Sequence, residues 1–339
     1  MTGKTTTALV TGGQGFIGSH LSVRLAKEGV KVFALDRAGK SNNAEFNRLV
    51  KEEKIVMFTG DVLTYDYTAL GKVDYIYHIA GKVSAWGDIE DFMTVNMGGT
   101  TRVLEYAKAI CPQCFTYYSS SAVYGYHGYK GLTEDAPKLP FDNPYSITKL
   151  KTEEFVKKYC SDHAISYVII RPGNVYGEYD FTSSHEIYGR IHDEKMVICA
   201  NGKYLSCFVY VGNLADATVI AAQNPSARNN DYNVTDGNDE TLREYFTAVA
   251  ESFGVRPKFF NIPAAFSKLT AILVEGIYKL LRLKKAPLIT KFSVWQNCAD
   301  YNFDISKIKN VGHLPAVSME EGVRRTANWY LQTYKEMLL

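Results

Sequence analysis

A tyrosine and a lysine four residues apart could together move a proton. Tyr145 and Lys149 lie in the segment Tyr-Ser-Ile-Thr-Lys, directly after Asn143-Pro144, where a helix is predicted to begin. Residues i and i+4 share one face of a helix, so the phenol and the ammonium should lie close together. A free tyrosine has a pKa of about 10 and is a poor catalyst near neutral pH. A neighbouring cation stabilises the phenolate, so the pair predicts acid–base chemistry at a substrate oxygen.

Three serines precede this pair in the chain. Ser119, Ser120 and Ser121 follow the apolar run 114–118. A serine at the end of a strand can hydrogen-bond a carbonyl or hydroxyl oxygen of a substrate and hold it near Tyr145. Taken alone, a serine cluster is more typical of an ordinary turn.

A glycine-rich segment near the start could bind a dinucleotide. Gly12, Gly15 and Gly18 form a GxxGxxG pattern around Phe16 and Ile17, between an apolar run and a helical stretch. Such glycines permit a tight turn, a close approach of the backbone to a pyrophosphate and close packing of the helix. The N–H groups at the helix N-terminus then attract the phosphates.

An acidic residue follows 18 residues after the last glycine. Asp36 ends the next apolar run, where a carboxylate accepts hydrogen bonds from ribose hydroxyls and repels a 2′-phosphate. This favours NAD over NADP. The adjacent Arg37 leaves the alternative open, because a guanidinium could accommodate a 2′-phosphate.

The elements that must position these residues alternate along the first half of the chain. Helices are predicted at 16–28, 93–109 and 145–163, and strands at 7–11, 31–35, 55–58, 73–79, 114–118 and 167–170. Strands that alternate with helices of this length predict an α/β fold with a doubly wound parallel sheet, of the Rossmann type. After about residue 175, polar loops at 178–184, 224–231 and 235–240 interrupt shorter elements. We therefore expect an NAD-binding domain at 1–175 and a smaller, helix-rich substrate lobe at 176–339, with a segment at about 205–225 returning to the first domain.

Composition excludes several classes of protein. The chain has 339 residues, of which 46% are hydrophobic and 22% charged, which is typical of a folded globular protein. A net charge of +2 does not support binding to nucleic acid. The chain contains no run of about 18 apolar residues, so no membrane span is predicted. The first residues lack the apolar core of a signal peptide, so a cytoplasmic location is expected. Cys111 and Cys114 form a lone CxxC without a second pair nearby, so no metal site is expected.

Several short motifs occur in a characteristic order. They are TGGQGFIG, Asp36, Asp61-Val62, His78-Ile79-Ala80-Gly81, Asn96 in NMGGT, SSSAVYG, YSITK and RPGNVYG. As a set, the motifs resemble the extended short-chain dehydrogenase/reductase superfamily, which shares the NAD-dependent epimerase/dehydratase fold. The resemblance covers about residues 5–220.

The resemblance implies roles for individual residues. Tyr145 is the general acid–base, and Lys149 is its electrostatic partner and a ligand of the cofactor ribose. Ser120, rather than Ser119 or Ser121, takes the position of the substrate-binding serine. The other residues implied at the cofactor are Asp61 and Val62 at the adenine, Ala80, Gly81, Lys82 and Asn96, and Pro172, Gly173 and Val175 beside the nicotinamide. Members of the family often dimerise, so a homodimer is also expected.

Three differences separate the branches of this superfamily. Dehydratases carry an Asp-Glu pair where this chain has Ser121 and Ala122, which argues against dehydration. Nucleotide-sugar enzymes usually carry a diphosphate-binding arginine where this chain has Ser206, although Arg190 or Lys203 could compensate. The segment Lys-Val-Ser-Ala-Trp-Gly at 82–87 resembles 3β-hydroxysteroid dehydrogenases and 2-alkyl-3-oxoalkanoate reductases.

These differences favour an oxidoreductase that interconverts a secondary alcohol and a ketone on a lipophilic small molecule. The alternative is a nucleotide-sugar 4-epimerase with tightly bound NAD. The residues expected at the substrate are Ser84, Trp86, Ser121 and Asn174.

A long apolar stripe marks the substrate lobe. Its members are Phe259, Phe260, Ile262, Phe266, Leu269, Ile272, Leu273, Ile277, Leu280 and Leu281, followed by Arg282, Lys284 and Lys285. An amphipathic helix of this kind could line a lipophilic pocket, lie on the surface of a membrane as a peripheral contact, or cover the core.

Overall fold

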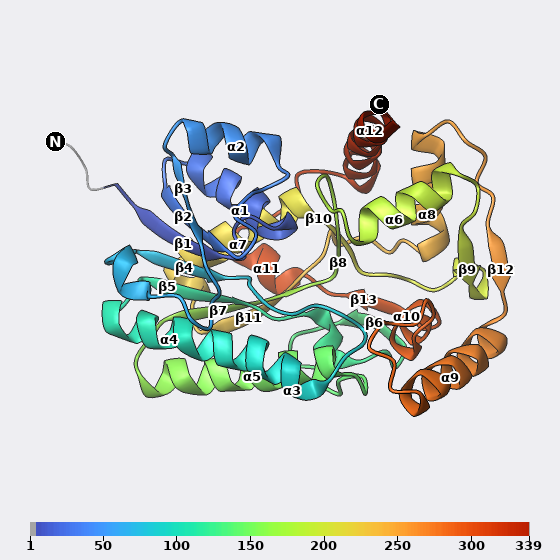
Figure 1. The fold of residues 1–339 in the computed structure, drawn as a ribbon, viewed down its shortest axis with the longest axis horizontal. Helices are drawn as coiled ribbons and strands as arrows, with labels where there is room; N and C mark the ends of the chain where they lie inside the picture. The colour runs from blue at the N-terminus through green and yellow to red at the C-terminus, as the bar shows by residue number, and fades with distance from the viewer. Residues whose placement is uncertain (1–4, 339) are drawn as a thin grey trace.

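The computed structural model describes residues 5–338 and is organised around one parallel sheet (Figure 1). Its seven strands run in the order β11-β7-β5-β4-β1-β2-β3. They span β1 (Thr7–Thr11), β2 (Lys31–Asp36), β3 (Ile55–Thr59), β4 (Tyr75–His78), β5 (Cys114–Tyr118), β7 (Tyr167–Pro172) and β11 (Asn230–Val234). The sheet confirms the predicted doubly wound α/β fold. The winding reverses between β1 and β4, and such a point opens a crevice at the carboxyl ends of the strands.

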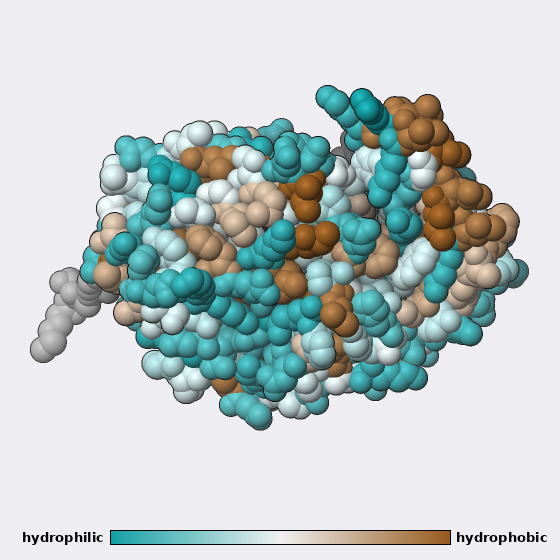
Figure 2. Space-filling view, turned by 90° about the horizontal axis from the view of Figure 1, so that it is seen from below, coloured by the Kyte–Doolittle hydropathy of each residue, from teal (hydrophilic) through white to brown (hydrophobic). Residues whose placement is uncertain are grey.

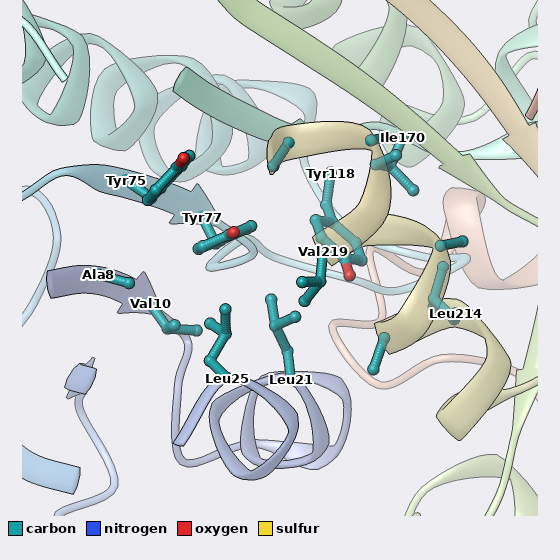
Figure 3. Close-up of a cluster of buried hydrophobic side chains, with 14 of the residues drawn as sticks. Ala8, Val10, Leu21, Leu25, Tyr75, Tyr77, Tyr118, Ile170, Leu214 and Val219 are labelled. Carbon is teal, nitrogen blue, oxygen red and sulfur yellow. The ribbon is translucent and has the colours of Figure 1, made fainter. Parts of the chain in front are cut away.

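Helices cover both faces of this sheet (Figure 1). One face is covered by α1 (Phe16–Lys27), α2 (Ala44–Lys51), α7 (Val211–Gln223) and α11 (Ser306–Asn310), and the other by α4 (Gly99–Ile110) and α5 (Pro144–Asp162). In Figure 3, Leu21 and Leu25 of α1 point into a cluster that also contains Val10 of β1 and Val219 of α7. Burial of these side chains on both faces explains why the strands read as almost continuous apolar runs.

Two predicted elements differ from the structure. The helix expected at 93–109 is divided into α3 (Ile89–Phe92), a π-helical turn (Met93–Gly98) and α4. The polar stretch 224–231 was predicted as a loop, but it contains a 3₁₀ turn (Pro225–Ala227) and the start of β11. The central sheet therefore includes residues beyond the segment 205–225 that was expected to return to the first domain. The strand tolerates a charge at its start because Asp231 pairs with the buried Arg171 of the neighbouring strand β7.

The rest of the chain forms a lobe at one end of the sheet (Figure 1). Its largest core lies among α6 (Ser183–His192), α8 (Leu242–Ser252) and α12 (Met319–Leu338). Three pairs of short parallel strands connect its parts: β8 (Asn174–Tyr176) with β10 (Phe208–Tyr210), β9 (Val197–Cys199) with β12 (Phe260–Ile262), and β6 (Tyr129–Leu132) with β13 (Tyr301–Phe303). Beyond these strands lie α9 (Ala264–Leu280) and α10 (Lys291–Asn297). Elsewhere in the chain, short 3₁₀ turns occur at Tyr67–Leu70, Ser121–Tyr124 and Ala200–Gly202.

Candidate active site

The glycine loop between β1 and α1 leaves no room for a side chain at Gly12 or Gly18. Gly12 has a φ of +69°, and a Cβ atom there would lie 3.0 Å from the backbone nitrogen of Ala80. A Cβ atom on Gly18 would lie 2.0 Å from the carbonyl oxygen of Gly12. Helix α1 begins after Gly15, whose missing side chain cannot cap it, so the first N–H groups of the helix are available to a phosphate. Phe16 and Ile17, half-buried in the first turn, pack against the apolar cores.

The end of β2 supplies an acidic group beside this loop. The Asp36 carboxylate accepts hydrogen bonds from the backbone nitrogens of Gln14 (3.3 Å) and Ala38 (3.2 Å). Arg37 is 75% exposed and turns toward Asp61, with 3.7 Å between the charged atoms. Gln14 was not among the predicted residues, yet its side chain donates to the carbonyl oxygens of Ala34 and Phe58 and ties the loop to β2 and β3.

A buried histidine fixes the end of β4. The ring nitrogens of His78 lie 2.7 Å from the Thr11 hydroxyl and 2.9 Å from the Thr100 hydroxyl. Burial, together with the charge of Lys149, lowers the pKa of His78 to about 3, so the ring is neutral. It therefore acts as a link between β1, β4 and α4, and the backbone nitrogen of Ala80 donates to the carbonyl oxygen of Thr11 beside it (3.1 Å).

The π-helical turn places Asn96 under the loop that follows β4. Its Oδ1 accepts from the backbone nitrogen of Lys82 (2.7 Å), and its Nδ2 donates to the carbonyl oxygen of Lys82 and to the hydroxyl of Thr148 (both 3.3 Å). These contacts with the protein make Asn96 a residue that positions the loop. A Cβ atom on Gly81 would lie 3.6 Å from Nζ of Lys149, so the loop also approaches the lysine.

Asp61 and Val62, the two residues predicted at the adenine, lie in a turn after β3. Asp61 accepts a hydrogen bond from the backbone nitrogen of Leu63 (2.9 Å), which holds its carboxylate in the turn. Val62 is buried, and a Cβ atom on Gly99 would lie 2.8 Å from its side chain. The close packing sets the distance between this turn and α4.

Helix α5 carries the tyrosine and the lysine. Asn143 caps it by accepting from the backbone nitrogen of Ser146 (2.8 Å), and Pro144 occupies the first turn. Lys149 is buried and donates to the carbonyl oxygen of Tyr118 (2.7 Å). Burial lowers the pKa of Lys149 to about 8. An ammonium has three donors, and no other acceptor for this one lies within hydrogen-bonding distance among the described residues, so donors remain for a bound ribose.

The three serines after β5 have different surroundings. The hydroxyl of Ser119 donates to the buried Glu153 (2.7 Å), and Ser121 is buried, with its carbonyl oxygen accepting from the Tyr301 hydroxyl. Ser120 accepts from the backbone nitrogen of Ala122 (3.2 Å) and caps the 3₁₀ turn. Burial raises the pKa of Tyr145, whereas a hydrogen bond with Ser120 acts to lower it. Of the three serines, Ser120 is therefore the one beside Tyr145.

The segment after β7 meets β10 at close range. A Cβ atom on Gly173, which follows Pro172 at the end of the strand, would lie 2.1 Å from the carbonyl oxygen of Cys207. Asn174 donates to the hydroxyl of Ser206 (3.1 Å) and accepts from the side chain of Gln296 (2.7 Å). Val175 packs against the hydrophobic cores. Gln296 belongs to α10, so this contact joins β8, directly after the last residues of β7, to α10.

A cleft of about 990 Å³ lies between the two lobes, and it is lined by neighbours of Tyr145 rather than by Ser120, Tyr145 or Lys149 themselves. Its lining includes Asn143, Pro144 and Ile147, which flank the tyrosine in α5, and Phe292, whose ring centre lies 6.4 Å from that of Tyr145. Ser84 and Trp86 also line it. The Ser84 hydroxyl accepts from the backbone nitrogen of Trp86 (3.1 Å), and the indole of Trp86 donates to the carbonyl oxygen of Leu283 (3.1 Å).

Comparison with known proteins assigns this arrangement to a family. Residues 8–235 match the NAD dependent epimerase/dehydratase family, so the chain belongs to that family. The match confirms the predicted relationship to the extended short-chain dehydrogenase/reductase superfamily, which contains both dehydrogenases and epimerases.

The relatives of this chain include both nucleotide-sugar epimerases and reductases. The chain is 27% identical over 334 residues to a putative UDP-glucose 4-epimerase of Methanocaldococcus jannaschii, with 95% of this chain and 97% of the relative covered. It is 25% identical over 340 residues to a 2-alkyl-3-oxoalkanoate reductase of Shewanella oneidensis, with 95% and 86% covered. Among solved structures, a UDP-N-acetylglucosamine 4-epimerase from Methanobrevibacter ruminantium superposes with a TM-score of 0.79 at 22% identity, over 97% of this chain and 99% of that one. That similarity establishes the fold.

Proposed function

We propose that this protein is an NAD-dependent oxidoreductase that interconverts a secondary alcohol and a ketone on a hydrophobic small molecule. The sheet domain would hold the cofactor at the glycine loop, Asp36 and Lys149, and the second lobe would select the substrate. Support comes from the neighbourhood of Ser120, Tyr145 and Lys149 at the carboxyl ends of the strands.

Each of the three side chains would have one task. Bound NAD would supply the acceptor for a hydride from the carbon that carries the hydroxyl. Tyr145 would take the hydroxyl proton at its phenolate oxygen, and Ser120 would donate a hydrogen bond that holds the substrate oxygen. The Lys149 ammonium would stabilise the phenolate and bind the ribose. In the reverse direction, Tyr145 would return the proton to the ketone oxygen.

The observation that carries the substrate class is the environment of Ser206. This residue stands where the related nucleotide-sugar enzymes usually carry an arginine, and here it is 9% exposed. Its hydroxyl accepts from Asn174, which is held in turn by Gln296, so the position is filled by a neutral hydrogen-bonded chain. A buried neutral chain cannot replace the bidentate, charge-assisted binding of a diphosphate by arginine. The cleft carries the aromatic rings of Phe141, Phe292 and Trp86, which would pack against an apolar substrate, beside four cationic and four acidic side chains.

The second candidate function is a nucleotide-sugar 4-epimerase. The relative from Methanocaldococcus jannaschii favours it, and so do Lys279 and Arg282, two cations that line the same cleft and could meet a diphosphate. An epimerase would use Tyr145 for a transient oxidation and would return the hydride to the same substrate.

A substrate panel distinguishes the two candidates. The purified protein is incubated with NAD and 3β-hydroxysterols, 3-hydroxyacyl esters, UDP-glucose or UDP-galactose, and NADH is followed by absorbance while the products are separated by chromatography. The proposal predicts net NADH with a sterol or an acyl ester. Interconversion of UDP-glucose and UDP-galactose without net NADH would establish the epimerase instead.

The same site predicts a preference for NAD over NADP. Asp36 would repel a 2′-phosphate, and the nearby guanidinium of Arg37 turns toward Asp61. Because a ligand that binds the native state raises Tm, NAD should raise Tm more than NADP at equal concentration. Asp36→Ala should abolish this difference, and Asp66→Ala, which removes an exposed carboxylate from the loop after β3, should preserve it. A larger rise with NADP in the unmodified protein would contradict this prediction.

A further inference from the structure

Helix α9 presents its apolar side chains to solvent. Six large residues are each about half exposed or more: Phe266, Leu269, Ile272, Leu273, Ile277 and Leu280. Their spacing of three and four residues places them along one side of the helix. In Figure 2 the largest hydrophobic area lies at the right-hand end of the molecule, the end where Figure 1 places α9.

The residues on the inward side of the same helix are small or polar. Ser267, Ala271 and Glu275 are spaced by four residues and are all buried. The Glu275 carboxylate accepts from the backbone nitrogen of Lys291 (2.5 Å), so it holds the start of α10. For the part of the apolar stripe that lies in α9, the alternative that it covers the core is therefore wrong, because the polarity of α9 is the reverse of that of a covering helix, whereas Phe259 before it does pack against the core.

Basic side chains follow the apolar ones along the chain. Lys279, Arg282, Lys284 and Lys285 are exposed, and none of them forms an ion pair with another residue of the range 5–338. Glu275 is the only acidic residue between 264 and 288, and it faces inward. Leu281, Leu283 and Leu288 extend the exposed apolar surface among these cations. We call residues 264–288 the α9 surface.

We infer that the α9 surface docks onto an anionic lipid bilayer, with α9 lying in the plane of the interface. An exposed apolar helix face with cations at its border is the pattern that binds the boundary between acyl chains and anionic headgroups. A second copy of the chain fits less well, because two α9 surfaces in contact would bring together cations and no exposed carboxylate. None of the helices within residues 5–338 has the length and apolar character needed to cross a membrane.

The α9 surface continues into the cleft. Arg282, Leu283 and Lys284 also line it, and Trp86 donates to the carbonyl oxygen of Leu283 at its rim. Docking would therefore place the cleft beside the lipid, where a hydrophobic substrate concentrates. This link to substrate entry rests on the proposed function, whereas docking does not.

Vesicle co-sedimentation tests the docking. The full chain is mixed with vesicles of equal parts phosphatidylglycerol and phosphatidylcholine, or of phosphatidylcholine alone, without substrate. We expect binding to the anionic vesicles that weakens when salt is raised, because salt screens the cations. The variant Leu269→Glu/Leu273→Glu should bind at least tenfold more weakly. Leu314→Glu, which alters an exposed leucine in the loop between α11 and α12, should bind like the unmodified protein.

Three results would overturn the inference: no binding to the anionic vesicles, undiminished binding by the double variant, or a dimer in sedimentation equilibrium that the double variant dissociates while vesicles remain unbound. Folding of each variant is checked by its Tm shift with NAD. NADH formation measured without vesicles reports on the proposed function separately, so either proposal can fail while the other stands.

Discussion

Tyr145→Phe is expected to reduce turnover by about 10²–10⁴-fold while leaving NAD affinity nearly unchanged. The substitution removes the hydroxyl that would exchange the proton with the substrate oxygen and leaves the ring against Phe292. Lys149 and the glycine loop, which would hold the cofactor, keep their contacts. Steady-state NADH formation and a separate measurement of NAD binding check the two parts.

Tyr77→Phe is a matched control for this prediction. It deletes the same atom from a fully buried tyrosine of β4 (Figure 3), and that hydroxyl has no hydrogen-bond partner among the described residues. The control should keep full turnover. If Tyr145→Phe turns over at the rate of the control, Tyr145 is not the acid–base group.

Glu153→Gln is expected to destabilise the protein by about 3–5 kcal/mol, because it leaves a buried guanidinium without its main counter-charge. Glu153 follows Lys149 by one turn of α5, and its carboxylate is 2.5 and 3.0 Å from two nitrogens of Arg171, which is fully buried. Burial opposes the charge on both groups, yet the hydrogen bonds between them keep the pKa of Arg171 above its usual range and that of Glu153 below it. Asp231 and Lys157 complete the cluster.

Thermal unfolding measures this effect. For a chain of 339 residues the unfolding entropy is about 0.7 kcal/mol per kelvin, so Tm should fall by about 4–7 °C. Glu154→Gln alters the next residue of the same helix, on its exposed side, and should change stability by no more than about 0.5 kcal/mol. Equal Tm values for the two variants would show that the buried ion pair contributes no net stability.

The order of elements around the cofactor site could be predicted from local patterns. Apolar runs separated by helical segments indicated six of the seven strands of the sheet, and the GxxGxxG pattern placed a tight turn before the first helix. These elements could be predicted because each pattern depends only on residues that are close together in the sequence. The seventh strand, β11, was missed because its first residues, Asn230 and Asp231, read as a loop, and only the pairing of Asp231 with Arg171 explains a carboxylate there.

The positions of several polar side chains depend on residues far away in the chain. The amide of Asn96, a residue predicted at the cofactor, holds the backbone of Lys82 and the hydroxyl of Thr148. Gln14 and His78 were not chosen as site residues, although they fix the glycine loop and the end of β4. Their partners are tens of residues distant, so no spacing rule could reveal them.

The sequence by itself determined the class of fold, the family and the set of residues proposed for hydride transfer, because turn geometry, helix periodicity and motif order are local properties. The tertiary structure gave the three adjacent buried serines different partners: Ser119 donates to Glu153, the carbonyl oxygen of Ser121 accepts from Tyr301, and Ser120, which the resemblance had already singled out, lies beside Tyr145. It also decided the orientation of α9. An amphipathic pattern specifies that a helix has an apolar side, but only packing against Ser267, Ala271 and Glu275 determines that this side faces outward.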